Sequence, residues 1–217
     1  PALESTLKRQ GKLKLLSMVE EISNINIHYI RQKHMRGLGD ASLCARSFMD
    51  NEPFAVLLGD DVVYNDVKPA LRQLMDMYED KQATILGCQE VAPNDVSAYG
   101  IVKGEKTANP ALLRVLDMVE KPAIEEAPSR FAVLGRYIIT PDIFPILEKT
   151  KPGKGGEIQL TDALQTLAGQ KAVYAYNFEG KLYDVGNKLG YLQATVEYAL
   201  RREDLGEKFR VYLKSTL

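Results

Sequence analysis

Apolar runs alternate with helical stripes along the middle of the chain. Phe54 to Val63 reads FAVLLGDDVV, an apolar run that ends in a glycine and two aspartates. A short unbroken apolar run followed by turn residues predicts a strand buried on both faces, as parallel sheets require. A helix follows, with Asp66 as its expected cap and Pro69 in its first turn, and residues 83–91 predict the next strand. This order of strand, helix and strand indicates a mostly parallel sheet covered by helices.

The flanking segments extend this pattern in both directions. Apolar spacing predicts helical structure from residue 3 to residue 19, a strand at 25–31 and a helix at 40–49. Further strands are expected at 99–103, 112–119, 131–139, 172–178 and 181–185, and further helices at 140–149, 157–168 and 188–202. Short spacers between the strands of the second half favour hairpins or an added antiparallel layer there. The expected fold class is therefore α/β, with a Rossmann-like mixed, mostly parallel sheet flanked by helices.

Composition narrows the class of protein. The chain has 217 residues, 45% of them hydrophobic and 26% charged, with a net charge of −1, which suits one sizeable core and lacks the basic excess of a nucleic-acid binder. We therefore expect a single domain over 1–217 with a C-terminal helical segment at 187–217, and no nucleic-acid or membrane partner. Cys44 and Cys88 lie in apolar settings without C-x-x-C spacing, which predicts reduced, buried thiols and a cytoplasmic location.

Acidic residues follow two predicted strands. Asp60 and Asp61 come after the strand that begins at Phe54, and Asp184 closes the strand at 181–185. Ligands of open α/β sheets bind outside the carboxyl ends of the strands. If Asp60 and Asp184 face each other there, the two carboxylates suit Mg²⁺, which also takes phosphate oxygens of a substrate. Turn or helix-cap roles for these aspartates remain the open alternative.

Glu120-Lys121-Pro122 ends another predicted strand. Because proline stops the strand, the two opposite charges are presented at its end. A carboxylate there can accept two sugar hydroxyls, and an ammonium beside it can neutralise a phosphate. The alternative is a solvated Glu-Lys pair that contributes almost nothing.

Two glycine-rich segments are weaker candidates. Gly37-Leu38-Gly39 follows a predicted strand and opens a helix, where backbone N–H groups can approach a ligand, but it lacks the third glycine of the dinucleotide fingerprint. A plain strand-to-helix turn is the alternative. Residues 153–156 (GKGG) lack the spacing of a P-loop, which excludes P-loop NTPase chemistry and leaves a mobile loop over the site or an ordinary surface loop.

Seven segments jointly resemble the bacterial UTP:glucose-1-phosphate uridylyltransferases, within the sugar-phosphate nucleotidyltransferases. They are IRQ…GLGDA (30–41), FAVLLGDD (54–61), SAYGIV (97–102), MVEKP (118–122), LGRYI (134–138), GGEIQLTDA (155–163) and YDVGNKLGY (183–191). The resemblance implies a fold of the nucleotide-diphospho-sugar transferase type. It also implies Mg²⁺-dependent attack of a glucose 1-phosphate oxygen on the α-phosphorus of UTP, which forms UDP-glucose and pyrophosphate.

The resemblance also implies roles for individual residues. By the matching motifs, the nucleobase is contacted by Gln32 and Gly37, Mg²⁺ is bound by Asp60 and Asp184, the sugar is lined by Gly100, Glu120 and Gly135, and the sugar phosphate is met by Lys121. Asp60, Lys121 and Asp184 would be the catalytic set. The resemblance also implies a homo-dimer or tetramer, so we expect a homo-oligomer.

Two departures from the family pattern qualify this interpretation. Asp40 stands where many relatives have histidine in G-L-G-H-A, which leaves the nucleotide contacts open. The family opens with a strand and a G-x-G-T-R loop that cradles the triphosphate, so we expect residues upstream of Pro1 to supply this loop and residues 1–217 alone to be inactive. The rival hypotheses are a sister transferase that uses another nucleotide, such as dTTP, and a catalytically silent module that binds nucleotide sugars.

Overall fold

The computed structural model describes residues 2–216, which fall into two compact units, one up to Lys33 and one from His34 on. The first unit contains α1 (Ala2–Arg9) and α2 (Leu13–Ser23), which are separated by a turn where Gly11 has a φ of 66°. The strand predicted at 25–31 is wrong, because this segment forms no regular structure. No described strand pairs with it, and alternating apolar residues alone do not form a strand without a partner.

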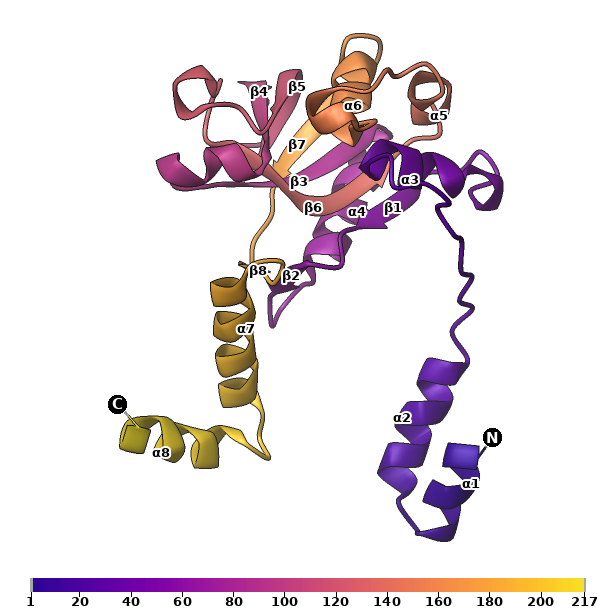
Figure 1. The fold of residues 1–217 in the computed structure, drawn as a ribbon, viewed down its shortest axis with the longest axis vertical. Helices are drawn as coiled ribbons and strands as arrows, with labels where there is room; N and C mark the ends of the chain where they lie inside the picture. Colours follow the sequence, from indigo (N-terminus) through magenta and orange to yellow (C-terminus); the bar gives the residue numbers. More distant parts are fainter. Residues whose placement is uncertain (1, 217) are drawn as a thin grey trace. The chain divides into compact units, whose positions relative to one another are not determined.

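The second unit is built on a six-stranded sheet (Figure 1). In spatial order it comprises β1 (Phe54–Leu57), β6 (Phe131–Ile139), β3 (Thr84–Glu90), β7 (Val173–Asn177), β5 (Leu112–Glu120) and β4 (Gly100–Lys106). A separate antiparallel ribbon pairs β2 (Asp61–Tyr64) with β8 (Lys181–Asp184). The helices are α3 (Leu38–Cys44), α4 (Ala70–Lys81), α5 (Ile143–Leu147), α6 (Leu160–Ala168), α7 (Lys188–Arg201) and α8 (Gly206–Thr216).

The sheet is mixed, as predicted, but the prediction that it is mostly parallel is wrong, because among the described strands only β3 and β7 pair in parallel. Strands β1, β3, β7 and β4 run in one direction, and β6 and β5 run in the other. The prediction that β1 is buried on both faces is wrong. Among the described strands it pairs only with β6. Its side chains do not all point into the core, since Phe54 is buried but Leu57 is 50% exposed.

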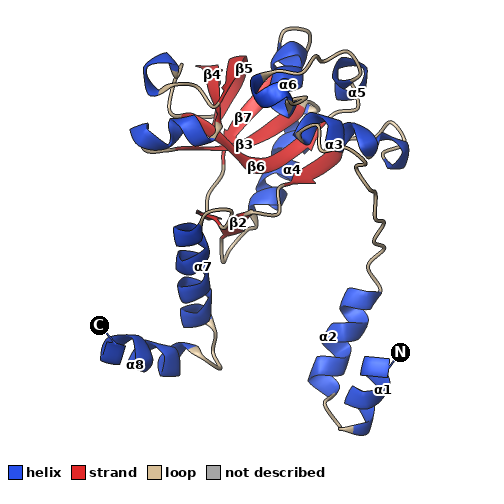
Figure 2. Cartoon of the chain, in the orientation of Figure 1, coloured by secondary structure: helices blue, strands red, loops and turns tan. Residues whose placement is uncertain are grey.

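Helices cover both faces of the sheet (Figure 2). On one face, α5 and α6 pack their apolar sides against the strands, and the cluster contains Leu86, Ile139, Phe144 and Leu164. On the other face, α4 supplies Leu74 to a second cluster. The buried strand side chains on the two faces therefore meet apolar helix sides, which is the burial that layered α/β packing predicts.

Several helix starts differ from the predicted ones, among them those of α4 and α5. Asp66 does not cap α4; instead, Oδ1 of Asn65 accepts hydrogen bonds from the backbone N–H groups of Val67 (2.8 Å) and Lys68 (2.9 Å), and the helix begins at Ala70. Helix α5 begins at Ile143 and not at the predicted position 140, where the hydroxyl of Thr140 is hydrogen-bonded to the hydroxyl of Thr84 at 3.1 Å. Asparagine and aspartate are both good turn formers, so sequence could not choose between neighbours.

The predicted C-terminal helical segment comprises α7 and α8. Helix α7 is tied to the ribbon, because the guanidinium of Arg201 lies 3.9 Å from the ring centroid of Tyr64 and donates a 2.7 Å hydrogen bond to the Tyr183 hydroxyl. None of the described helices combines the length and the apolar character needed to cross a bilayer. The single-domain organisation over 1–217 stays a prediction.

Candidate active site

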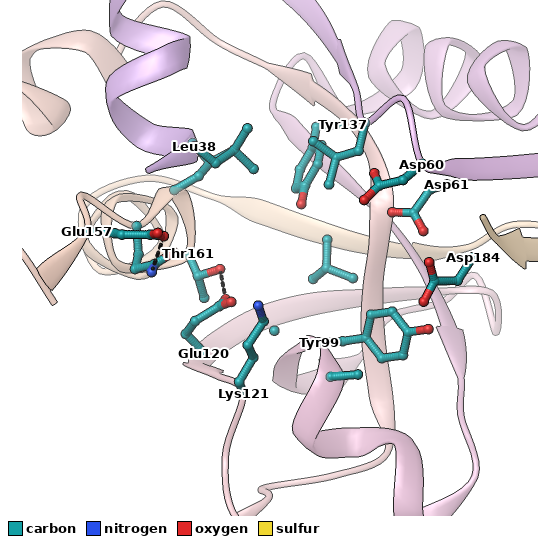
Figure 3. Close-up of a pocket in the computed structure, with 16 residues that line it drawn as sticks. Leu38, Asp60, Asp61, Tyr99, Glu120, Lys121, Tyr137, Glu157, Thr161 and Asp184 are labelled. Atoms are coloured by element: carbon teal, nitrogen blue, oxygen red, sulfur yellow. Dashed lines mark hydrogen bonds between the residues drawn. The ribbon is translucent and has the colours of Figure 1, made fainter. Parts of the chain in front are cut away.

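A pocket in the second unit is lined by residues from seven parts of the chain (Figure 3). They come from the β1–β2 turn, the adjacent ends of β4 and β5, β6, α6, the start of α3 and the end of β8. The polar lining residues are Asp60, Asp61, Tyr99, Glu120, Lys121, Tyr137, Glu157, Gln159, Thr161 and Asp184. The pocket therefore collects most of the charged residues that the sequence singled out.

Asp60 and Asp184 lie beside each other in this pocket. The ribbon register places Asp61 opposite Asp184, and the N–H of Val185 donates to the carbonyl of Asp60 at 2.8 Å. A Cβ atom on Gly186 would lie 3.0 Å from Oδ1 of Asp184 and 3.2 Å from Oδ2 of Asp60. The two carboxylates therefore flank one small space that the glycine leaves open.

The orientation of Asp184 is fixed by the residues that follow it. Its Oδ1 accepts a hydrogen bond from the N–H of Gly186 (2.9 Å), and its Oδ2 accepts one from the side-chain amide of Asn187 (3.0 Å). Asn187 in turn caps α7, because its Oδ1 accepts from the N–H of Gly190 at 2.7 Å. Asp184 thus makes turn contacts, as the alternative interpretation proposed, and still lines the pocket.

Asp61 is the buried member of the acidic cluster. It is 7% exposed, and its pKa is raised to about 6, first by burial and then by repulsion from Asp60 and Asp184, while the charge of Arg136 lowers it. Gly135 makes this burial possible. Its φ is +57°, and a Cβ there would overlap Oδ2 of Asp61.

A bulge in β6 receives the turn that carries the aspartates. Between two aligned pairs, β3 has only Gly87 where β6 has residues 134–136. The carbonyl of Gly135 accepts from the N–H of Leu58 at 2.9 Å, and the guanidinium of Arg136 donates to the carbonyls of Leu58 and Asp61. Bulges often re-aim strands beside functional sites. Here the bulge holds the 58–61 turn against the pocket.

Strand β6 also links the acidic cluster to the second charged group. It pairs with β1 at its carboxyl half and with Ile101 of β4 near its start. At the neighbouring end of β4, Gly100 lies opposite Glu120 of β5. Strand β5 runs opposite to β1, so the rule that ligands lie at the carboxyl ends of parallel strands does not explain why Glu120 lies near the acidic cluster. The two groups come together because the long strand β6 contacts both β1 and β4.

Glu120 and Lys121 are held in defined positions at the end of β5. Thr161 donates a 2.5 Å hydrogen bond from its hydroxyl to Oε2 of Glu120. Lys121 has a φ of +45°, which residues with a side chain rarely adopt, and its N–H donates to the carbonyl of Tyr99 at 3.0 Å. Such strain often accompanies a functional position.

Two tyrosines complete the lining near the carboxylates. Burial raises the pKa of Tyr99 to about 12, with added contributions from the negative charges of Asp184 and Asp61. Tyr137 is 7% exposed, and burial likewise raises its pKa. Both hydroxyls therefore remain neutral at physiological pH and can donate hydrogen bonds into the pocket.

The glycine-rich segment at 37–39 packs against the segment that precedes α6. Gly37 has a φ of +100°, and a Cβ there would lie 2.8 Å from the carbonyl oxygen of Ile158. The N–H of Gly39 donates to the same carbonyl at 2.9 Å. Leu38 between them lines the pocket, and Asp40 is buried with an ion pair of 2.7 Å to Arg36.

The predicted site residues are not all in this pocket. It is lined by Asp60, Gly100, Glu120, Lys121 and Asp184. Gly37 and Gly135 lie just behind the lining, against Ile158 and Asp61 respectively. Gln32 is half-buried and belongs to the first unit.

Sequence reasoning did not assign roles to Thr161, Tyr99 or Tyr137. Thr161 lies within the GGEIQLTDA segment and Tyr99 within SAYGIV, so the motifs marked their neighbourhoods. A motif does not say which of its side chains points into a pocket. Asp61 stood beside Asp60 in the sequence, and only its burial against Gly135 distinguishes the two.

The donor set suits a hard cation. Two carboxylates flank the space above Gly186, and Mg²⁺ is commonly held by one or two carboxylates together with phosphate oxygens and water. Among the described residues, no group of three His, Cys, Asp or Glu side chains is arranged to hold a metal ion. A cation here would therefore depend on the substrate and on water for its remaining ligands.

A mixed α/β sheet with carboxylates and a lysine around one pocket is typical of transferases that act on phosphate esters. The family model described as nucleotidyl transferase matches residues 1–201. The UTP–glucose-1-phosphate uridylyltransferase of Bacillus subtilis (strain 168) is 48% identical over 218 residues, which span 100% of this chain and 74% of that protein. The chain therefore belongs to the nucleotidyl transferase family and, within it, to the bacterial UTP–glucose-1-phosphate uridylyltransferases.

Solved structures agree with this assignment. A UDP-glucose pyrophosphorylase complexed with UDP-glucose is 44% identical with a TM-score of 0.82, and the match covers 90% of this chain and 73% of that one. A UTP-bound UGPase from Acinetobacter baumannii is 35% identical with a TM-score of 0.87, over 98% of this chain and 74% of that one. The predicted family and fold type are confirmed.

Proposed function

We propose that the protein forms UDP-glucose and pyrophosphate from UTP and glucose 1-phosphate. The observation that carries this proposal is the meeting of Asp60 and Asp184 over Gly186 in the same pocket as Glu120 and Lys121. A phosphate oxygen of glucose 1-phosphate attacks the α-phosphorus of UTP in line, the new P–O bond forms, and pyrophosphate leaves with the bonding electrons. No side chain becomes covalently attached.

The acidic pair fits the nucleotide side of this reaction. Asp60 and Asp184 would hold Mg²⁺, which when bound neutralises the charge on phosphate oxygens. The hydrogen bonds from Gly186 and Asn187 keep the Asp184 carboxylate turned toward this space. By the resemblance, Gly37 contacts the base.

The second charged group fits the sugar phosphate. The carboxylate of Glu120 accepts hydrogen bonds from hydroxyl groups of glucose, and the ammonium of Lys121 neutralises the charge of the attacking phosphate. Nucleotidyl transfer is accelerated mainly by positioning and charge neutralisation, so side chains held by strand ends suffice. We further infer a cytoplasmic homo-dimer or tetramer, which the exposed apolar side chains of α7 and α8, such as Leu192 and Tyr212, support.

A panel of nucleoside triphosphates tests this function. The full-length protein is incubated with Mg²⁺, glucose 1-phosphate and UTP, dTTP, ATP, CTP or GTP, and pyrophosphate release is measured. We expect UTP to be used best. A preference for dTTP would show that the protein is a sister transferase that uses another nucleotide. Binding of UDP-glucose without pyrophosphate release from any triphosphate would indicate a silent binding module.

A further inference from the structure

We propose that Thr161 is a positioning residue that fixes the Glu120 carboxylate for one sugar hydroxyl, an inference that rests on the proposed function. The two side chains come from different elements. Glu120 is the last residue of β5, and Thr161 lies in the first turn of α6. Their hydrogen bond, 2.5 Å from Oγ1 to Oε2, is drawn in Figure 3 at the edge of the pocket.

Gly100 leaves the space that this hydrogen bond needs. It is the register partner of Glu120. A Cβ at Gly100 would lie 3.1 Å from Oγ1 of Thr161 and 3.2 Å from Oε2 of Glu120. Opposite residues in an antiparallel pair point to the same face, so any side chain at position 100 would press on the hydrogen bond itself. The glycine, the threonine and the glutamate thus form one unit.

Helix α6 holds the threonine rigidly. Leu160, Ala163, Leu164 and Leu167 of this helix are all buried in the core. Threonine is also restricted about χ1, because its β-carbon is branched. A rigid donor is therefore presented to Glu120 before any ligand arrives, which is how supporting residues preorganise a binding site.

The hydrogen bond gives the two carboxylate oxygens of Glu120 different roles. Oε2 accepts from Thr161, and the Glu120 carboxylate makes no other hydrogen bond with the described residues. Oε1 is then left to accept a hydroxyl of the sugar. A side chain that is already oriented loses less rotational freedom on binding, so the threonine improves affinity for the sugar without touching it.

Thr161→Val tests this role in the full-length protein. We expect the KM for glucose 1-phosphate to rise about tenfold, while kcat and the KM for UTP change less than twofold. Thr161→Ser keeps the hydroxyl and should restore most of the loss. Thr166→Val is the matched control, because Thr166 is an exposed residue of the same helix whose hydroxyl donates to the carbonyl of Asp162.

Deoxy analogues separate positioning from a general packing defect. One of the two analogues, 2-deoxy- or 3-deoxyglucose 1-phosphate, should lack the hydroxyl that Glu120 binds. With that analogue, Thr161→Val and the wild type should have the same KM. The same penalty with glucose 1-phosphate and both analogues would overturn the proposal, as would an unchanged KM. Absence of pyrophosphate release by the wild type is a separate result, since it refutes the proposed function itself. Thermal unfolding of each variant reports whether the fold is intact.

Discussion

The carboxylate of Asp61 occupies the space that a side chain at Gly135 would need. Gly135 was expected, by resemblance, to line the sugar, but it lies behind the pocket wall. Its positive φ and the bulge of β6 turn the backbone so that the buried carboxylate fits. Glycine at position 135 therefore leaves the space in which the Asp61 carboxylate is buried.

Gly135→Ala should destabilise the protein by more than the backbone conformation alone explains. The left-handed conformation costs an alanine about 1–2 kcal/mol, and the overlap with Asp61 adds roughly 1–3 kcal/mol. Gly155→Ala is the matched control, because Gly155 has a φ of +73° with open space around it. Urea denaturation measures both variants. Equal losses in the free energy of unfolding would contradict the close approach of residues 61 and 135.

Asp60→Asn should lower kcat about 10²-fold or more at saturating Mg²⁺ without unfolding the protein. The amide keeps the shape of the side chain but loses the charge that attracts a cation. Pyrophosphate release is the measurement, with thermal unfolding alongside. Asp66→Asn, at an exposed aspartate of the following loop, should behave as wild type. Normal turnover by Asp60→Asn would rule out the metal role.

Lys121→Ala should raise the KM for glucose 1-phosphate about tenfold or more and change the KM for UTP much less. The ammonium of Lys121 lies in the pocket lining, where it would neutralise the sugar phosphate, and charge-assisted bonds to phosphate are strong. Steady-state kinetics with each substrate varied in turn provide the test. Lys103→Ala, on an exposed position of β4, is the control. Unchanged saturation by glucose 1-phosphate would contradict the assignment.

The raised pKa of Asp61 predicts a pH dependence of stability. An aspartate in water has a pKa of 3.8, whereas the pKa of Asp61 in the folded protein is about 6, so the folded state binds the proton more tightly. The free energy of unfolding should therefore fall as pH rises from about 4 to about 6, by at most roughly 3 kcal/mol and by less after solvent screening.

Asp61→Asn isolates this contribution. Because asparagine resembles the protonated carboxyl group at every pH, the variant should gain stability relative to wild type as pH rises through this range. Urea denaturation at about pH 4, 5, 6 and 7 gives the difference. A difference that does not change with pH would show that Asp61 has an ordinary pKa, and Asp66→Asn again provides the exposed control.

The amino-acid sequence by itself determined the α/β class, most of the helices and strands, the family and the segments around the pocket. These features depend on local periodicity and on motifs such as FAVLLGDD and MVEKP, which can be read residue by residue. The same local signals failed at 25–31, where no described strand is present to pair, and at Asp66, where the adjacent asparagine makes the turn before α4 and no side chain caps the helix.

Tertiary structure alone decided how the candidate site is assembled. Strand direction, the bulge of β6 and the ribbon of β2 and β8 bring Asp60 next to Asp184 and both near Glu120. It also decided that Asp61 is buried and that Thr161 meets Glu120 across Gly100. Distances between residues far apart in the sequence depend on which strands pair and in which register, and that choice is made by packing of the whole core.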